Sequence, residues 1–216
     1  MKIIAVISQK GGAGKTTLAV HLASAAVAAG FTTAIIDLDP QGTAASWGDR
    51  RTGSTPEVIS GQAVRLPALT AIARENGADI VILDTAPNAD QSASLSTRIA
   101  DIVLIPCRPS TFDLEAIETT FLLTKVAQKP SYVVLNAVPP RSGIGREAAD
   151  GLRAGGAQVA PHQLTQRAAF GHSVIDGRTA QEFEPGGKAA QEITLLFSWL
   201  CGIVGIPPQG HSRKAA

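Results

Sequence analysis

The sequence is poor in cysteine, aromatic and charged residues, and each shortage excludes a class of protein. Only two cysteines occur among 216 residues, Cys107 and Cys201, so neither a disulfide framework nor a cysteine metal cluster is available. Aromatic residues make up 4% of the chain, which argues against a base-stacking surface for single-stranded nucleic acid. Charged residues make up 17% and hydrophobic residues 44%, which excludes a globally disordered chain.

Long apolar segments and an excess of one charge are also missing. The apolar run 3–7 is too short for a signal peptide. The uncharged stretch 193–209 is interrupted by glycine and proline, so its apolar part falls short of the roughly 20 residues that span a bilayer. The net charge of +1 gives no support to nucleic-acid binding by bulk positive charge, although a local basic patch stays compatible with it. These features predict a soluble, cytoplasmic protein.

The chain is rich instead in short aliphatic runs that alternate with longer helix-like stretches. The runs cover residues 3–7, 33–36, 80–83, 102–105 and 132–135, and the expected helices cover 16–29, 67–75, 114–126 and 188–200. Such continuous apolar runs are typical of strands buried on both faces of a parallel sheet. We therefore expect an α/β fold, a doubly wound and mostly parallel sheet flanked by helices, with ligands at the carboxyl ends of its strands.

No composition shift marks a boundary within this pattern. We expect a single domain over residues 1–206, a flexible tail over 207–216, and loops over 53–61 and 139–145.

The strongest local pattern lies between the first expected strand and the first expected helix. It reads Lys10-Gly11-Gly12-Ala13-Gly14-Lys15-Thr16-Thr17. The glycines let backbone N–H groups turn toward a phosphate, and the start of the helix adds the positive end of its dipole. Lys15 would place its charge on the β- and γ-phosphates, and the Thr16 hydroxyl would bind Mg²⁺. The segment therefore predicts a nucleotide site, with Gln9 where the ordinary phosphate loop has a glycine.

With its first lysine, this segment resembles the deviant Walker A motif, Lys-Gly-Gly-x-Gly-Lys-Thr-Thr, of the ParA/MinD group of ATPases. The resemblance implies a P-loop NTPase fold, ATP and Mg²⁺ as cofactors, and slow, partner-stimulated hydrolysis of ATP to ADP and phosphate. It also implies an ATP-dependent homodimer in which Lys10 reaches the phosphates of the partner subunit. A cation supplied in trans would stabilise the charge of the transition state.

Carboxylates follow two of the expected strands. Asp37 and Asp39 come after the run 33–36, and Asp84 comes after the run 80–83. Alternation along an extended end places Asp37 and Asp39 on the same side, where such a pair can hold Mg²⁺ through water and orient the attacking water. Asp84 has the position of a Walker B carboxylate near the metal. The resemblance matches Asp39 to the family residue tied to hydrolysis.

Three further segments carry the resemblance. Residues 85–88 would be a switch that senses the γ-phosphate, and residues 106–113 match the family's Pro-x-x-Pro-Ser loop. Asn136 ends the run 132–135, where relatives place an asparagine against the adenine. An asparagine there is also typical of a turn or a helix cap, so both interpretations of Asn136 stay open.

The C-terminal part indicates which member of the group the chain resembles. Residues 164–167, Gly177 and residues 188–193 look like the corresponding part of small ParA partition ATPases, including the ParF kind. This likeness implies non-specific binding of double-stranded DNA, association with the nucleoid in the ATP state and a small DNA-binding adaptor similar to ParB or ParG. The cargo, whether plasmid, chromosome or protein cluster, is left open.

The charge distribution agrees with a DNA-facing second half. Residues 1–120 contain 9 basic and 12 acidic side chains, whereas residues 121–216 contain 10 basic and 6 acidic ones. The candidate contacts to DNA phosphates are Arg141, Arg146, Arg153, Arg167, Arg178 and Lys188. Each of them is equally well explained as an ordinary solvated side chain.

Two other functions compete with this one. A MinD-like membrane-associated positioning ATPase would use residues 193–206 and the nearby Arg213 and Lys214 as an anchor. The apolar residues there run nearly all round the helix, which favours a core-packed terminal helix over an interfacial one. The second alternative is a nucleotide-dependent scaffold that assembles without useful turnover.

Overall fold

The alternating pattern folds into one parallel sheet in the computed structural model, which describes residues 1–87 and 90–207. Within this part the strands are β1 (Lys2–Val6), β2 (Thr33–Asp37), β3 (Glu57–Ser60), β4 (Ile80–Asp84), β5 (Ile102–Cys107) and β6 (Ser131–Leu135). Their order across the sheet is β3-β2-β4-β1-β5-β6, and neighbouring strands are parallel. The loops that follow β1, β2, β4, β5 and β6 therefore share one edge of the sheet.

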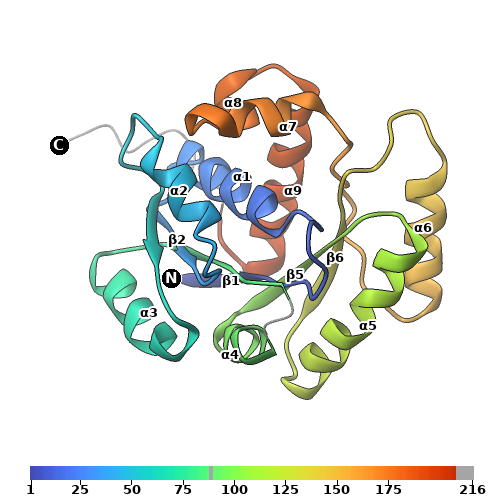
Figure 1. The fold of residues 1–216 in the computed structure, drawn as a ribbon, viewed down its shortest axis with the longest axis horizontal. Coiled ribbons are helices and arrows are strands. Elements are labelled where there is room, and N and C mark those ends of the chain that lie inside the picture. The colour runs from blue at the N-terminus through green and yellow to red at the C-terminus, as the bar shows by residue number, and fades with distance from the viewer. Residues whose placement is uncertain (88–89, 208–216) are drawn as a thin grey trace.

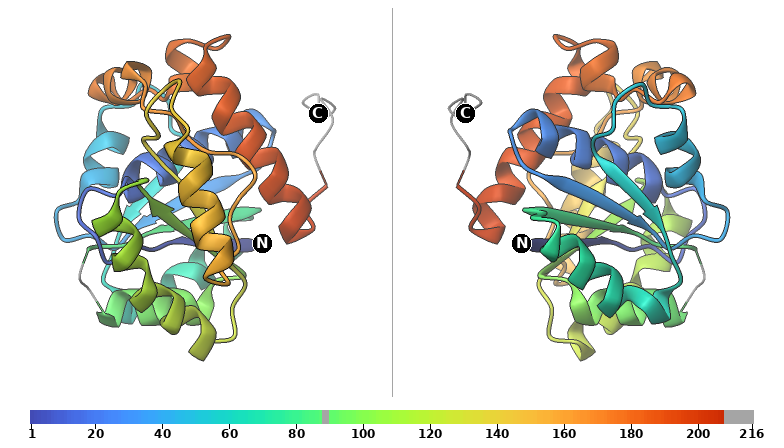
Figure 2. Two further views of the ribbon diagram at one scale, coloured as in Figure 1. Left: turned by 90° about the vertical axis from the view of Figure 1, so that its right-hand side faces the viewer. Right: turned by 90° about the vertical axis from the view of Figure 1, so that its left-hand side faces the viewer.

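Helices cover both faces of this sheet, as Figures 1 and 2 show. They are α1 (Lys15–Ala28), α2 (Thr43–Asp49), α3 (Leu66–Glu75), α4 (Asp90–Ile99), α5 (Thr111–Val126), α6 (Ile144–Ala154), α7 (Ala168–Ser173), α8 (Ala180–Phe183) and α9 (Lys188–Val204). Helices α1, α2 and α9 contribute to the core on one face, and α3, α4, α5 and α6 contribute to the core on the other.

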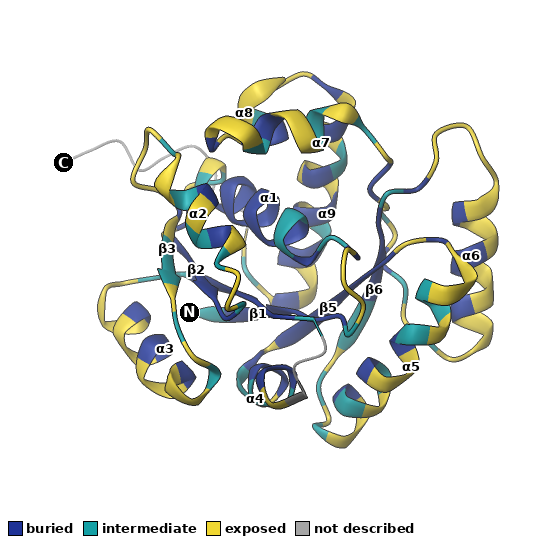
Figure 3. Cartoon of the chain, viewed as in Figure 1, coloured by how far each residue is buried: buried dark blue, intermediate teal, exposed yellow. Residues whose placement is uncertain are grey.

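The strands divide their side chains between these two cores by simple alternation. In β1, Ile4 and Val6 face α1 and α9, whereas Ile3 and Ala5 face the opposite helices. Strands β2, β4 and β5 are buried over their full length, and β1 is buried except at Lys2. Figure 3 shows this burial against the exposed outer surfaces of the helices. Burial on both faces is the reason that the runs are continuous in the sequence, and the predicted α/β class with a parallel sheet is confirmed.

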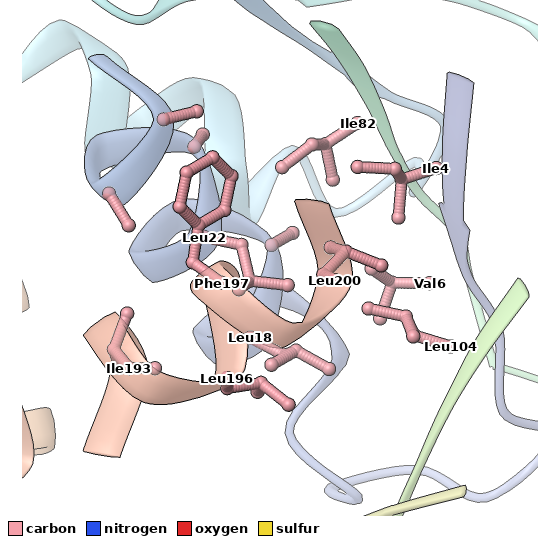
Figure 4. Close-up of a cluster of buried hydrophobic side chains, with 14 of the residues drawn as sticks. Ile4, Val6, Leu18, Leu22, Ile82, Leu104, Ile193, Leu196, Phe197 and Leu200 are labelled. Atoms are coloured by element: carbon pink, nitrogen blue, oxygen red, sulfur yellow. The ribbon is translucent and has the colours of Figure 1, made fainter. Parts of the chain in front are cut away.

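Helix α9 packs as a core helix. Figure 4 shows Ile193, Leu196 and Leu200 beside Leu18 and Leu22 of α1. The helix runs past the predicted residue 200 to Val204 and ends at Gly205, whose φ of 68° closes it. The core-packed interpretation of this segment is thus confirmed. No helix in the described ranges is both long enough and apolar enough to cross a membrane.

Two predicted loops are partly wrong. Residues 57–60 lie in the expected loop 53–61 but form β3, which pairs in parallel with β2 at the sheet edge. A strand at the edge of a sheet buries little side-chain surface. Only Val58 and Ile59 of β3 are half-buried, so the strand has no apolar run that would predict it from the sequence. The expected loop 139–145 ends earlier, because α6 begins at Ile144. The predicted tail, residues 207–216, lies outside the described residues except for Pro207.

Candidate nucleotide-binding site

A cavity of about 440 Å³ opens at the carboxyl-terminal edge of the sheet. It gathers residues from the loops after five strands, from the first turn of α1, from the segment before α7 and from α7 itself. Its lining consists of Gly12, Gly14, Lys15, Thr16, Thr17, Asp39, Pro87, Arg108, Asn136, Ala137, Thr165, Gln166, Arg167 and Phe170. The structure thus brings most of the predicted nucleotide-binding residues to one place. Gly11 and Ala13 belong to the same phosphate loop, residues 10–17, without lining the cavity themselves.

Gly14 shows why the loop needs glycine. Its φ of 94° lies in the left-handed region, and a Cβ there would stand 2.0 Å from Nδ2 of Asn136. The Asn136 amide comes this close because Nδ2 donates a hydrogen bond of 2.8 Å to the Ala13 carbonyl. Its Oδ1 accepts the N–H of Ala137 at 2.9 Å. Asn136 therefore ties the phosphate loop to the end of β6, and its predicted contact with adenine stays a prediction.

Lys15 is held inside the loop rather than in solvent. Its exposed fraction is 6%, and its ammonium group donates to the Lys10 carbonyl at 3.2 Å. Burial lowers the pKa of Lys15, and the negative charges of Asp84 and Asp39 act in the opposite direction. A buried cation beside glycine N–H groups is what the phosphate-binding role requires. Lys10 itself is exposed, as a side chain that acts on a partner subunit would be.

Asp37 and Asp84 lie side by side in the sheet, because they are register partners on β2 and β4. Both are buried, but their surroundings differ. The Asp37 oxygens accept the N–H groups of Asp39 at 3.0 Å and Ala45 at 2.9 Å, so this carboxylate braces the loop after β2 and the start of α2. Neither Asp84 oxygen has a hydrogen-bond partner within the described residues.

This unpartnered carboxylate is the feature that fits a divalent cation. Burial raises the pKa of Asp84 to about 7, the Thr16 side chain acts against this rise, and the charges of Asp37 and Asp39 add to it. A cation would satisfy both oxygens and remove the cost of burying the charge. No group of three or more His, Cys, Asp or Glu side chains in the described ranges is arranged to hold a metal alone. Mg²⁺ commonly takes one or two protein ligands together with phosphate and water, so Thr16 and Asp84 suit it.

Asp39 stands at the border of two hollows. It lines the nucleotide cavity and also a neighbouring hollow of about 1170 Å³ that runs toward α4. Asp39 is half-buried, and its Oδ1 accepts the N–H of Gln41 at 2.9 Å. In the predicted switch segment, the Thr85 hydroxyl donates to the Val6 carbonyl at 2.9 Å and Pro87 lines both hollows. The last residue of that segment, Asn88, lies outside the described residues.

Three of the predicted DNA contacts come together. Arg141, Arg167 and Lys188 line a hollow of about 590 Å³ that shares Thr165 and Arg167 with the nucleotide cavity. We call it the basic hollow. Arg167 is held there by Glu192 of α9, with 2.6 Å between Nη2 and Oε1.

The other three candidates lie elsewhere. Arg146 and Arg153 belong to α6, where Arg153 pairs with Asp150 at 3.1 Å. Arg178 pairs with Asp176 at 2.7 Å and lies over the Phe183 ring at 4.9 Å from its centre. Both of these ion pairs are largely exposed, which makes them weak.

Several cavity residues were not predicted to bind the nucleotide. Thr165, Gln166 and Phe170 reach the cavity from a segment far along the chain. The stretch 164–167 was noted only for its likeness to partition ATPases, and no local pattern placed it at the nucleotide. Glu192 positions that segment, since it accepts the Thr165 N–H at 2.9 Å and the Thr165 hydroxyl at 2.8 Å. Arg108 also lines the cavity. It lies in the 106–113 loop, whose match to the Pro-x-x-Pro-Ser pattern was the feature of the sequence that could have pointed to it.

Comparison with known sequences points in the same direction as the geometry. The profile of the CobQ/CobB/MinD/ParA nucleotide-binding domain matches residues 4–179. The chain is 34% identical over 202 residues to the maintenance of carboxysome distribution protein A of Gloeobacter kilaueensis, which covers 88% of this chain and 93% of that protein. The protein of the same name from Halothiobacillus neapolitanus is 27% identical over 205 residues, covering 90% and 94%. The chromosome partitioning protein ParA of Caulobacter vibrioides is 32% identical over 130 residues, covering 51% and 49%.

Solved structures share the fold at low sequence identity. The ATP complex of a McdA variant from Cyanothece superposes with a TM-score of 0.76 at 17% identity, covering 96% of this chain and 97% of that chain. The Mg-ADP complex of MinD from Pyrococcus horikoshii superposes with a TM-score of 0.77 at 17% identity, covering 98% and 99%.

Proposed function

The chain belongs to the CobQ/CobB/MinD/ParA nucleotide-binding family, and from this premise we propose that it is a ParA-type positioning ATPase. It dimerises on Mg-ATP, binds double-stranded DNA without sequence preference and positions a cargo. Partner-stimulated hydrolysis of ATP then resets it. The observation that carries the proposal is the phosphate loop with Lys15 buried beside Asp39 and the unpartnered Asp84.

Each residue of the site has a role in this proposal. Backbone N–H groups of residues 11–17 and the Lys15 ammonium bind the phosphates. Thr16 and Asp84 hold Mg²⁺, which neutralises phosphate charge when it is bound. Asp39 orients the attacking water, and Asp37 keeps Asp39 in place through its bond to the Asp39 N–H. Lys10 completes the site of the partner subunit.

The basic hollow supports the DNA-binding part. Arg141 and Lys188 line it with no carboxylate in ion-pair contact within the described residues, so both are available for DNA phosphates. The hollow shares Thr165 and Arg167 with the nucleotide cavity. A change at the nucleotide would therefore reach the proposed DNA contacts directly, which supports association with the nucleoid only in the ATP state.

The relatives favour a protein assembly as the cargo. Two proteins that match over nearly their whole length are named for the distribution of carboxysomes, whereas the partition protein of Caulobacter vibrioides matches over about half of the chain. We propose a small DNA-binding adaptor similar to ParB or ParG as the link between this ATPase and its cargo. The MinD-like alternative has less support, because the buried apolar side chains of α9 pack in the same core cluster as those of α1.

The trans-acting lysine is tested by Lys10→Ala, with Lys125→Ala on the exposed last turn of α5 as the matched control. Size-exclusion chromatography with light scattering in Mg-ATP, together with the stimulated ATPase rate, gives the readout. We expect a dimer for the wild type and the control, and a monomer with basal turnover for Lys10→Ala. A Lys10→Ala protein that still dimerises on ATP and keeps stimulated turnover would show that the trans-lysine mechanism is wrong.

The DNA-binding proposal is tested with a labelled duplex of random sequence. Fluorescence anisotropy in Mg-ATP, in Mg-ADP and without nucleotide should show binding in Mg-ATP alone, weakening steeply as salt is raised. The double variant Arg141→Ala, Lys188→Ala should lose binding, and Arg153→Ala, already paired with Asp150, should keep it. Equal binding without nucleotide, or binding to anionic liposomes in place of DNA, would contradict the proposal. The scaffold alternative predicts no useful turnover, so a measurable rate of ATP hydrolysis would contradict it.

A further inference from the structure

Arg108 borders the nucleotide cavity from the loop that follows β5, the strand next to β1, and it lies inside the 106–113 segment. Its Nη2 atom stands 3.7 Å from the position that a Cβ on Gly12 would occupy. Gly12 belongs to the phosphate loop and has a φ of 72°. The tip of the arginine therefore lies against the outer turn of the loop that is built to surround phosphates.

The backbone beneath Arg108 is held firmly. The Arg108 carbonyl accepts the Ser110 N–H at 2.8 Å, and the carbonyl of the preceding Cys107 accepts the Asn136 N–H at 2.8 Å. Pro106 and Pro109, close on either side, restrict the chain further. Asn136 is the same residue that ties the phosphate loop to β6. The base of the Arg108 side chain and the phosphate loop are thus fixed to a common point, which lowers the entropy that a phosphate contact would cost.

The guanidinium of Arg108 is also available. Four other arginines, Arg51, Arg153, Arg167 and Arg178, form ion pairs with carboxylates. Arg108 forms none with any described residue, and its guanidinium makes no hydrogen bond to one. An arginine that stays unpaired beside a cavity already lined by Lys15 concentrates positive charge there. A polyphosphate neutralises such charge, and a guanidinium suits two phosphate oxygens at once.

We propose that Arg108 binds the phosphate chain of the nucleotide held by its own subunit, as a second cation beside Lys15 that the phosphate-loop motif does not contain. The inference rests on the proposed nucleotide site. The inference goes beyond that site, because it assigns to the 106–113 loop a direct contact with the nucleotide bound by the same subunit.

The experiment is titration calorimetry of the full chain with Mg-ADP and with a non-hydrolysable Mg-ATP analogue. ADP is the decisive ligand, because its binding does not require the dimer. Arg108→Ala should bind both nucleotides about tenfold more weakly, the loss expected for a charge-assisted hydrogen bond. Arg108→Lys should recover part of that loss, because lysine keeps the charge without the two-pronged geometry. Arg74→Ala, on the exposed last turn of α3, is the matched control and should bind like the wild type.

A structural role is separated by two further readouts. The melting temperature without nucleotide should be the same for Arg108→Ala and the wild type, since the side chain is exposed and unpaired. The affinity for ADP should fall less steeply with salt in Arg108→Ala than in the wild type, because one phosphate contact is gone. Either an ADP affinity of Arg108→Ala within twofold of the wild type, or a loss confined to the ATP analogue, overturns the inference. If the wild type itself fails to bind Mg-ADP, the proposed nucleotide site is overturned as well.

Discussion

His21 makes the stability of this protein depend on pH in a direction that can be stated in advance. The imidazole lies in α1 with an exposed fraction of 0%, and its Nδ1 donates to the Thr17 carbonyl at 2.7 Å. The other nitrogen, Nε2, is buried without a partner in the described part of the chain. A proton added there would create an unsatisfied N–H and a buried charge. Burial accordingly lowers the pKa of His21 from 6.5 to about 4, although the Thr17 bond and the charge of Glu182 act against it.

The size of the effect follows from these two pKa values. Between pH 6.5 and pH 4 the unfolded chain binds a proton that the folded protein does not, so the free energy of unfolding falls as the pH falls. At pH 5 the difference amounts to about 1.5 pH units, or roughly 2 kcal/mol. Below pH 4 this contribution stays constant. Asp84, with its pKa raised to about 7, acts in the opposite direction, because the folded protein then binds the extra proton between pH 3.8 and pH 7.

Because these two contributions oppose each other, the assay compares variants. Urea unfolding of the nucleotide-free wild type and of His21→Gln, whose amide can still donate to the Thr17 carbonyl, is measured at pH 7.5 and pH 5. The Asp84 contribution is common to both proteins and cancels. We expect the wild type to lose about 2 kcal/mol relative to His21→Gln on acidification. His172→Gln, which alters an exposed histidine, is the control. A wild-type-to-variant difference that stays constant between the two pH values would refute the reasoning.

Five other substitutions probe the backbone and the core. Gly177→Ala should lower the free energy of unfolding by more than about 2 kcal/mol, because its φ is 79° and its Cβ would stand 2.6 Å from the backbone that follows α2. Gly171→Ala, where a Cβ meets nothing within 4 Å inside α7, should instead raise it by about 0.5–1 kcal/mol in the same urea titration. Gly14→Ala should weaken Mg-ADP binding in calorimetry, because the added Cβ would stand 2.0 Å from the side-chain nitrogen Nδ2 of Asn136. Leu200→Ala, at 0% exposure between α1 and the sheet, should cost about 2–5 kcal/mol, and Leu195→Ala, at 52%, less than about 0.5 kcal/mol.

Prediction from the sequence succeeded where a local pattern carries its own physical cause. A strand that is buried on both faces must be apolar throughout, so β1, β2, β4, β5 and β6 were visible as runs. Edge strand β3 was missed because its outer residues, Glu57 and Ser60, are exposed. Helix α6 was missed because its intrinsic helix preference is weak, with glycine at 145 and 151. It forms because Ala148, Ala149 and Leu152 pack in the core beneath β6.

The nucleotide site divides in the same way. The phosphate loop is a continuous segment whose glycines, lysine and threonine act through their own backbone and side chains, so eight consecutive residues sufficed to predict it. The far wall of the cavity comes from Thr165, Gln166 and Phe170, which only the packing of the C-terminal segment brings near the loop. Periodicity in the sequence reports which face of an element is buried, and it does not report which distant loops meet.

The sequence by itself determined the kind of chemistry, because it sets which charged and hydroxyl groups follow which strands. Only the tertiary structure decided what each of these groups does. Asp37 and Asp84 look alike as carboxylates that end apolar strands, yet the fold gives Asp37 two backbone N–H partners and leaves Asp84 without any in the described residues. The sequence offered Arg167 as a DNA contact and Arg108 only as part of the 106–113 segment, and the fold brought both to the nucleotide cavity, one held by Glu192 and the other unpaired in the described residues. The physical reason is that the pKa, the charge pairing and the reach of a side chain depend on its neighbours in space, which the chain supplies from segments far apart.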